Sequence, residues 1–118
     1  MPRPIKRRIV CNLPYFDLYG PIEGDKDSIH NFVIMTIEEF ETIRLIDFEG
    51  LDQEQCAESM EVARSTIQRI YNEARKKIAE GLITGKTLKI EGGNYSICPE
   101  EDKLNRCGHC RRHQNRKR

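Results

Sequence analysis

Tryptophan is absent from the sequence, and aromatic residues make up only 7% of its 118 positions. Long hydrophobic runs are also missing, because no apolar segment approaches the ~20 residues that a membrane-spanning helix needs. The basic N-terminus is not followed by the apolar stretch of a secretory signal. The length excludes a barrel enzyme or a complete dinucleotide-binding fold, which need roughly 200 residues or more. We therefore expect one small cytoplasmic domain with no membrane contact.

Catalytic signatures are equally scarce. The sequence shows no nucleophile–base pair, no phosphate-binding loop and no pair of carboxylates at a catalytic spacing, so we do not expect an enzyme. The apolar fraction of 37% predicts a small core that a metal ion, a partner chain or tight helix packing would supplement. Five cysteines in a cytoplasmic chain indicate metal ligands or free thiols rather than disulfides.

The net charge of +1 hides a strong segregation of charge along the chain. Residues 12–62 carry a net charge of −11, whereas residues 63–89 carry +5. Both ends are basic, with four basic and no acidic side chains in residues 1–11 and seven basic and no acidic ones in residues 103–118. Such blocks indicate a polyanionic partner better than the total charge does. The acidic side chains expected in a loop or on a solvated helix face are Asp25, Asp27, Glu38, Glu39 and Glu41.

Apolar periodicity predicts three helices. Thr36, followed three residues later by Glu39, forms a capping box that begins the first helix. Gly50 ends this helix. Asp52 caps a second, shorter helix, on whose apolar side Cys56 is expected to be a buried small hydrophobe. The third and longest helix is predicted from about residue 64 to about residue 82.

The chain divides into four predicted segments. Residues 1–35 form a basic arm and an irregular segment, in which Ile9-Val10 is compatible with a short strand. Residues 36–86 form a helix-turn-helix domain, residues 87–98 a β-hairpin, and residues 99–118 a cysteine-bearing basic tail. The expected fold class is therefore mainly α: a three-helix domain containing a helix-turn-helix, with a small C-terminal β-hairpin and a cysteine metal knuckle.

The helix-turn-helix prediction rests on the packing demands of two crossing helices. Ala57 is small at the expected crossing point, Val62 follows the turn, and Ile67 faces the preceding helix. Glu61 and Ala63 depart from the common form of the turn, in which glycine is followed by a serine cap. A plain bundle of three amphipathic helices is the alternative interpretation.

The start of the third helix carries side chains that suit the major groove of DNA. In a helix-turn-helix the N-terminal part of the second helix enters this groove, where arginine pairs with guanine and glutamine with adenine. The predicted base-reading residues are Arg64, Ser65, Thr66, Gln68 and Arg69, and the predicted phosphate contacts are Arg75, Lys76 and Lys77.

The two basic ends extend this predicted interface. An N-terminal arm can enter the minor groove beside a major-groove helix, and a basic C-terminal tail adds nonspecific phosphate affinity. The alternative interpretation is a pair of solvated termini. The arm residues are Arg3, Lys6, Arg7 and Arg8.

The cysteines predict a structural metal site. Cys107 and Cys110 form a C-x-x-C knuckle with a glycine between them, and Cys98 lies nine residues earlier. Cys11 is the preferred fourth ligand, because a strand at Ile9-Val10 would bring it toward Cys98; His113 is the next candidate, and His109 is a third. The implied cofactor is zinc. Free thiols in a disordered tail are the alternative.

Several motifs also occur in a consistent order along the chain. They are Met-Pro-Arg-Pro at the start, Arg8-Ile9-Val10-Cys11 with Pro14, Glu39-x-Glu41-x-x-Arg44-Leu45-x-Asp47-x-Glu49-Gly50-Leu51, Ala74-Arg75-Lys76-Lys77 and Ile90-Glu91-Gly92-Gly93-Asn94-Tyr95. With the helix-turn-helix they resemble the domain-of-unknown-function-134 family of predicted DNA-binding proteins, over residues 1 to about 97. That family is similar to the promoter-reading C-terminal domain of sigma factors, so the resemblance implies a helical fold and DNA binding.

Two hypotheses follow from the sequence. The first is a sequence-specific DNA-binding protein that regulates transcription, compatible with a homodimer on a two-fold DNA site. The second is a metal-binding or redox-responsive adaptor whose helices bind a protein such as RNA polymerase. Replacing Arg64 and Arg69 with alanine distinguishes them, because the first hypothesis requires that DNA binding is lost while metal binding survives.

Overall fold

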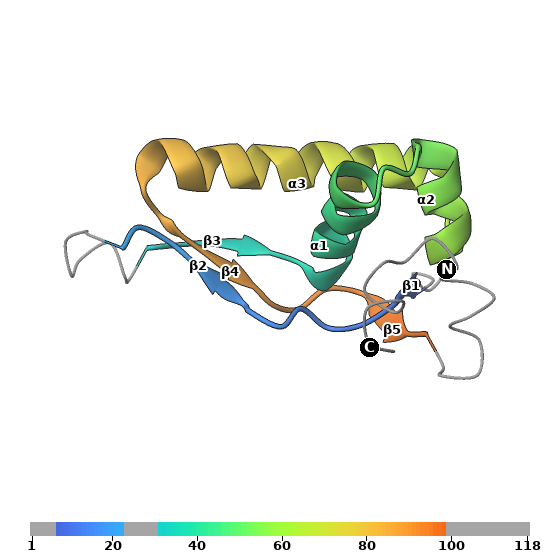
Figure 1. The fold of residues 1–118 in the computed structure, drawn as a ribbon, viewed down its shortest axis with the longest axis horizontal. Helices are drawn as coiled ribbons and strands as arrows, with labels where there is room; N and C mark the ends of the chain where they lie inside the picture. Colours follow the sequence, from blue (N-terminus) through green and yellow to red (C-terminus); the bar gives the residue numbers. More distant parts are fainter. Residues whose placement is uncertain (1–6, 23–30, 99–118) are drawn as a thin grey trace, which may run out of the picture.

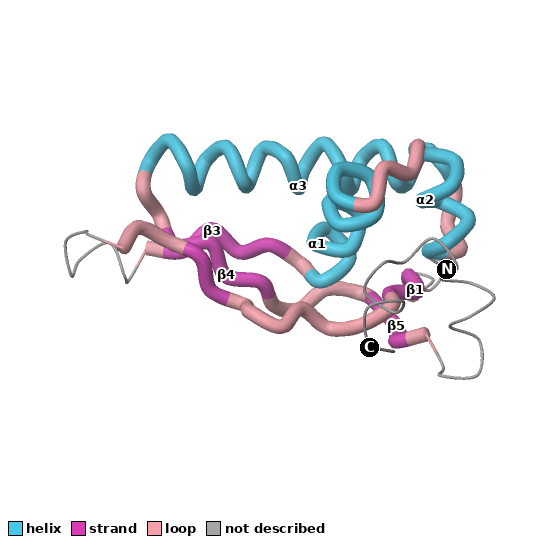
Figure 2. The backbone as a smooth tube through the Cα atoms, in the orientation of Figure 1, coloured by secondary structure: helices cyan, strands magenta, loops and turns pink. Residues whose placement is uncertain are grey.

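The computed structural model describes residues 7–22 and 31–98, which fold into a layer of helices over two small sheets (Figure 1). The long helix α3 lies across a three-stranded sheet of order β2-β4-β3, in which β4 is antiparallel to β2 and parallel to β3 (Figure 2). Below α1 and α2, strands β1 and β5 pair in parallel as a separate sheet. The strands are β1 (Arg8–Val10), β2 (Leu18–Tyr19), β3 (Phe32–Met35), β4 (Thr87–Ile90) and β5 (Tyr95–Ile97).

The predicted first helix forms as α1 (Ile37–Ile43) and continues as a π-helical segment, η2 (Arg44–Phe48). Its predicted capping box is confirmed. The Thr36 hydroxyl accepts a hydrogen bond from the Glu39 amide at 3.2 Å, and the Glu39 carboxylate accepts one from the Thr36 amide at 2.8 Å. These bonds satisfy two of the amides that a helix start leaves without partners.

The other two helices also form where they were predicted. Asp52 caps α2 (Gln53–Met60), which ends at Glu61. Glu61 adopts a left-handed conformation with φ 57°, the conformation that glycine usually supplies in this turn. Ala63 precedes α3 (Arg64–Thr84) and gives it no side-chain cap, as the sequence indicated. The helix continues until Gly85, whose φ of 73° ends it.

The core lies where all three helices meet β1 and the ends of β3 and β4. The predicted packing positions Ala57, Val62 and Ile67 all belong to this cluster. Cys56 is also fully buried there, as predicted, and burial raises the pKa of its thiol to about 12. The buried residues are Val10, Met35, Ile37, Leu45, Leu51, Cys56, Ala57, Met60, Ile67, Ala74 and Ile90.

The predicted hairpin over residues 87–98 is wrong, although both of its strands exist. β4 pairs with β2 and β3, whereas β5 pairs with β1. The reason lies in the connection, which binds the start of α1: the Gly92 carbonyl accepts the Ile37 amide at 3.0 Å, and the Asn94 amide donates to Glu38 at 2.8 Å. A Cβ atom at Gly93 would collide with the Glu38 carboxylate, so this close approach needs glycine.

The segment 1–35 was expected to be irregular, apart from the strand at Ile9-Val10, which forms as part of β1. Two further strands, β2 and β3, lie in this segment. They are two and four residues long, too short to show a clear alternation in the sequence. Their pairing with β4, far along the chain, is what defines them as strands.

Candidate nucleic-acid interface

The N-terminal two thirds of α3 carry a continuous polar face. Ile67, Ile70 and Ala74 bury the opposite side of the helix against α1 and α2. The helical repeat therefore turns the intervening side chains to solvent. We call these exposed residues the polar face of α3: Arg64, Ser65, Gln68, Arg69, Asn72, Glu73, Arg75 and Lys76. Six of them were predicted to contact DNA, whereas Asn72 and the acidic Glu73 were not.

The turn between α2 and α3 fixes the direction in which this face points. The Val62 amide donates to the Ala57 carbonyl at 3.0 Å, and the Ile67 amide donates to the Ala63 carbonyl at 3.2 Å. Because Ala63 offers no side-chain acceptor, the first turn of α3 keeps the partial positive charge of an uncapped helix start. Such a helix start favours phosphate groups.

Arg75 is held in place by an aromatic neighbour. Its guanidinium carbon lies 5.4 Å from the centre of the Tyr71 ring, a cation–π distance. The Tyr71 hydroxyl donates a 2.7 Å hydrogen bond to Asp47 at the end of η2, and this bond raises the pKa of the phenol above its ordinary value. Arg75 is thus positioned on the polar face through contacts that reach back to the first helix.

Three other predicted contacts are placed less favourably for DNA. The Lys77 ammonium lies 2.7 Å from the Glu39 carboxylate, and the Arg8 guanidinium lies 3.5 Å from that of Glu38. Both cations therefore join segments of the fold. Thr66 is half-buried, whereas Arg7 is exposed. Arg3 and Lys6 lie outside the described residues.

The acidic residues of α1 are buried, which corrects the expectation that they lie on a solvated face. Glu41 is only 1% exposed. Its carboxylate accepts bonds from the Arg44 side chain at 2.7 and 2.9 Å and from the Cys11 amide at 2.7 Å. Glu38 and Glu39 are tied to β1, to α3 and to the 91–94 connection in the same way. Asp25 and Asp27 lie outside the described residues.

Exposed charge differs between α2 and α3. The polar face of α3 carries four basic side chains and one acidic one, whereas the exposed charged residues of α2 and its cap are the acidic Asp52, Glu54 and Glu58. A polyanion is therefore attracted to α3 and repelled by α2.

Cys11 and Cys98 lie together at the ends of β1 and β5. The register pairs Val10 with Ile97, and the Cys98 amide donates to the Val10 carbonyl at 2.7 Å. Both cysteines are buried and pack with Ile9. Cys107 and Cys110, the other predicted ligands, and the candidates His109 and His113 lie outside the described residues. Within residues 7–22 and 31–98, no three His, Cys, Asp or Glu side chains are grouped so that they could hold a metal ion.

Comparison of the sequence with known proteins places the chain in a family. The sequence model of the family DUF134, described as a protein of unknown function, matches residues 1–98. A UPF0251 protein of Desulfitobacterium hafniense is 54% identical over 101 residues, which cover 83% of this chain and 78% of the relative. A UPF0251 protein of Thermoanaerobacter is 47% identical over 106 residues, which cover 90% of this chain and 93% of the relative.

No solved structure matches the chain. In the described part of the chain, none of the helices has the length and apolar character needed to cross a membrane. The matched family model and the relatives nevertheless agree along most of the sequence, and the chain belongs to the DUF134 family.

Proposed function

We propose that this protein is a cytoplasmic, sequence-specific DNA-binding protein that regulates transcription. In this proposal α2, the turn at residues 61–63 and α3 act as a helix-turn-helix, with the polar face of α3 in the major groove. The observation that carries the proposal is the polar face itself. It combines four basic side chains and the single acid Glu73 with Ser65, Gln68 and Asn72 on the exposed side of a helix whose other side is held in the core.

The two ends of the polar face suit different parts of a duplex. Arg64, Gln68 and Arg69 lie in the first turns, where side chains of a recognition helix reach base edges. Arginine can form paired hydrogen bonds with guanine, and glutamine with adenine. Arg75 and Lys76 lie farther along the helix and are suited to phosphates. The four cations of the face alone would give a slope of log affinity against log salt of about −3 to −4.

The experiment is a selection of random duplexes by the purified full chain at two salt concentrations, with and without a chelator. We expect an enriched sequence motif that the Arg64→Ala/Arg69→Ala double variant no longer selects. Lys89→Ala controls for the loss of one positive charge and is compared with Arg64→Ala and Arg69→Ala singly, because Lys89 lies on β4, outside the polar face. An unchanged motif with the double variant would contradict the proposed site. Retention without any motif would contradict sequence-specific binding and favour the adaptor that binds RNA polymerase.

The adjacent cysteines favour a second, compatible proposal, a structural zinc site. We propose that Cys11 and Cys98 supply two of its thiolates, because pairing of β1 with β5 joins two buried cysteines from opposite ends of the sequence. Cys107 and Cys110 are the proposed remaining ligands. Zinc would clamp the N-terminal and C-terminal segments together.

Metal content of the purified protein tests this second proposal. We expect one zinc ion per chain, lost in Cys11→Ser and kept in the control Cys56→Ala, since Cys56 is buried in the main core. Absence of zinc after purification in its presence, or retention of zinc by Cys11→Ser, would contradict the site. DNA binding by the zinc-free protein then shows whether the metal matters for recognition.

A further inference from the structure

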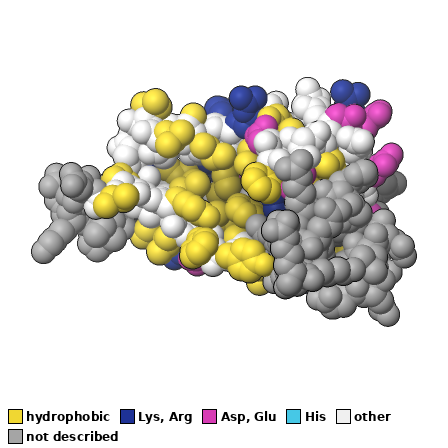
Figure 3. All heavy atoms as spheres, viewed as in Figure 1, with side chains coloured by type: hydrophobic (Ala, Val, Ile, Leu, Met, Phe, Trp, Pro, Cys, Tyr) yellow, Lys and Arg dark blue, Asp and Glu magenta, His cyan; other side chains and the backbone are white. Residues whose placement is uncertain are grey.

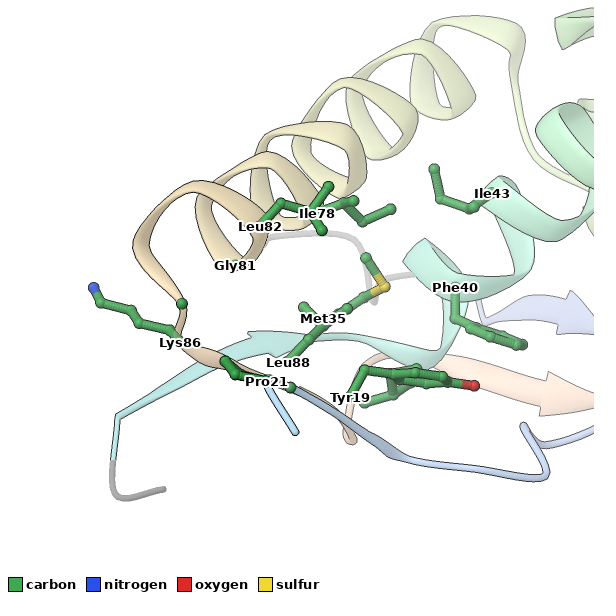
Figure 4. A pocket seen from close by; sticks show the side chains of 13 residues that line it. Tyr19, Pro21, Met35, Phe40, Ile43, Ile78, Gly81, Leu82, Lys86 and Leu88 are labelled. Atoms are coloured by element: carbon green, nitrogen blue, oxygen red, sulfur yellow. The ribbon is translucent and has the colours of Figure 1, made fainter. Parts of the chain in front are cut away.

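An apolar groove lies beside the C-terminal third of α3. It is an open cavity of about 600 Å³ between this part of the helix, α1 and the inner face of the three-stranded sheet. Figure 3 shows hydrophobic side chains gathered in a hollow on this side of the molecule. In Figure 4 the lining comes from helices and strands together. The principal apolar side chains are Tyr19, Met35, Phe40, Ile43, Ile78, Leu82 and Leu88.

The groove leaves large apolar side chains in contact with water. Leu82 is 78% exposed and Tyr19 is 47% exposed, although both line the cavity. Ile83, the next residue of the helix, is 85% exposed. A contiguous exposed patch of this kind marks an interaction site more often than an incidental surface. At Tyr19 of β2 and Leu88 of β4 the inner face of the sheet borders this open cavity, where a packing partner would normally cover it.

We propose that a second copy of this chain docks on the groove. The two grooves face each other across a two-fold axis and bury Leu82 and Tyr19 of both protomers. The inference extends the proposed function without depending on it. Ser65 and Leu82 are separated by roughly 25 Å along the helix at ~1.5 Å per residue. A dimer formed at the groove therefore leaves the polar face of each α3 accessible.

The charges around the groove identify its occupant. Lys86 lines the groove and forms an ion pair with Glu80 at 3.2 Å, which places an acid and a base at the rim; the side chains of Glu80 and Lys86 are 50% and 40% exposed. A rim with one acid and one base is complementary to itself, because a two-fold rotation can place Lys86 of one protomer against Glu80 of the other. A nucleic acid or an anionic membrane surface would require a net positive rim instead.

The interior of the groove argues against a small-molecule ligand. Ligand pockets combine an apolar wall with a few polar groups that converge on the ligand. Here Lys86 is the charged residue of the lining, and Figure 4 shows its side chain pointing away from the cavity. An apolar centre within a charged, solvent-exposed rim is instead the anatomy of a homodimer interface.

The first test is the oligomeric state of the full chain without DNA. Light scattering after gel filtration should give twice the chain mass of 13.8 kDa. Leu82→Glu should raise the dimer dissociation constant by at least about tenfold, since it places a charge at the apolar centre. Its side chain is largely exposed in the protomer, so circular dichroism should show an unchanged fold.

Two matched controls separate the groove from other exposed apolar surface. Phe48→Glu alters η2, where the side chain is 69% exposed, and Ile34→Glu alters the outer face of the sheet, where it is 41% exposed. Both variants should remain dimeric. A monomeric wild-type chain at high micromolar concentration would overturn the proposal. So would a dimer that Ile34→Glu or Phe48→Glu dissociates and Leu82→Glu does not.

A charge exchange tests the two-fold arrangement. Glu80→Lys and Lys86→Glu should each weaken the dimer, because each places like charges opposite one another. Mixing the two variants should restore dimerisation, since every pair across the axis is again of opposite sign. Failure of the mixture to dimerise better than either variant alone would overturn the contact between Lys86 and Glu80. DNA binding is not measured in these tests, so their failure is distinguishable from failure of the proposed function.

Discussion

The two ends of α3 differ in what covers them and in what they expose. Residues 64–77 are packed on their inner side against α1 and α2, and their outer side is polar and basic. Residues 78–84 border a half-covered sheet and expose Leu82 and Ile83 to water. One helix of 21 residues thus joins two surfaces of opposite chemistry. The firmly packed end can hold the proposed recognition side chains in place, and the open end is accessible for the proposed assembly.

The difference originates in the neighbours of α3. α1 crosses the helix, and the Lys77–Glu39 ion pair marks this crossing (Figure 1). Beyond this point the open cavity lies between α3 and the sheet, with Ile78 and Leu82 on one side and Tyr19 of β2 on the other. The packed end therefore depends on the buried carboxylates of α1, whereas the open end depends on none of them. Substitutions at the two ends should consequently have different effects on folding.

The largest effect is expected from Glu41→Ala, which would disrupt the support of the packed end. This change leaves the buried Arg44 guanidinium without its main partner and removes an acceptor from the Cys11 amide. Breaking a buried ion pair in this way costs about 3–5 kcal/mol of unfolding free energy. Urea denaturation measures it, with the exposed Glu73→Ala as the control expected to change stability by less than about 0.5 kcal/mol. A loss below about 1 kcal/mol would show that α1 is not the support.

Truncating one aliphatic side chain at each end of α3 compares how much packing at that end contributes to stability. Ile67→Ala should cost about 2–5 kcal/mol, because the side chain is fully buried and its removal leaves a cavity. Leu82→Ala should change the stability of the monomer by no more than about 0.5 kcal/mol. Denaturation at a protein concentration below the dimer dissociation constant measures both. Equal losses would mean that the two ends are packed alike.

The packed end should also lose stability in alkaline solution. The pKa of Cys56 is raised from 9.0 to about 12 in the folded protein by burial. The unfolded chain therefore ionises this thiol first, and the stability that the neutral thiol contributes is complete below pH 9 and lost as the pH rises toward 12. The slope is at most about 1.4 kcal/mol per pH unit. Denaturation between pH 8 and 10.5 should show it, and Cys56→Ala should flatten it. If Cys56→Ala leaves the slope of unfolding free energy against pH unchanged, the loss of stability comes from other ionisable groups.

A smaller gain is expected at the start of α3. Ala63→Ser supplies the missing cap and should stabilise the protein by about 1 kcal/mol. The matched change Ala79→Ser, at an exposed position within the same helix, should destabilise it slightly because serine is the poorer helix former. Thermal unfolding followed by circular dichroism separates the two. A loss of stability in Ala63→Ser would show that this turn cannot accommodate a serine cap.

The helices could be predicted because their signals are local. Thr36 and Asp52 lie within three residues of the groups that they cap, and the apolar repeat continues along each helix. The short strands could not be predicted from local sequence, because β3 becomes a strand only by pairing with β4, which lies far along the chain. The left-handed Glu61 was also missed, because nothing in a glutamate indicates the conformation that the turn imposes on it.

The candidate site shows the same division. The exposed polar side of α3 follows from helical periodicity and was predicted. Lys77 and Arg8 look equally available in the sequence, but they pair with Glu39 and Glu38 from another segment. Burial of those glutamates gave no local signal, since a charged residue is exposed unless the fold provides a partner. The groove was missed for the same reason, as it forms between elements.

The most direct test of the central claim is to map the DNA contact by amide chemical shifts. The isotope-labelled full chain is titrated with a short duplex at low salt, and amide peak shifts are followed residue by residue. We expect the largest shifts at residues 64–76, with little change at the groove or on the outer face of the sheet. Shifts confined to the basic ends of the chain, or centred on the groove, would contradict recognition by α3.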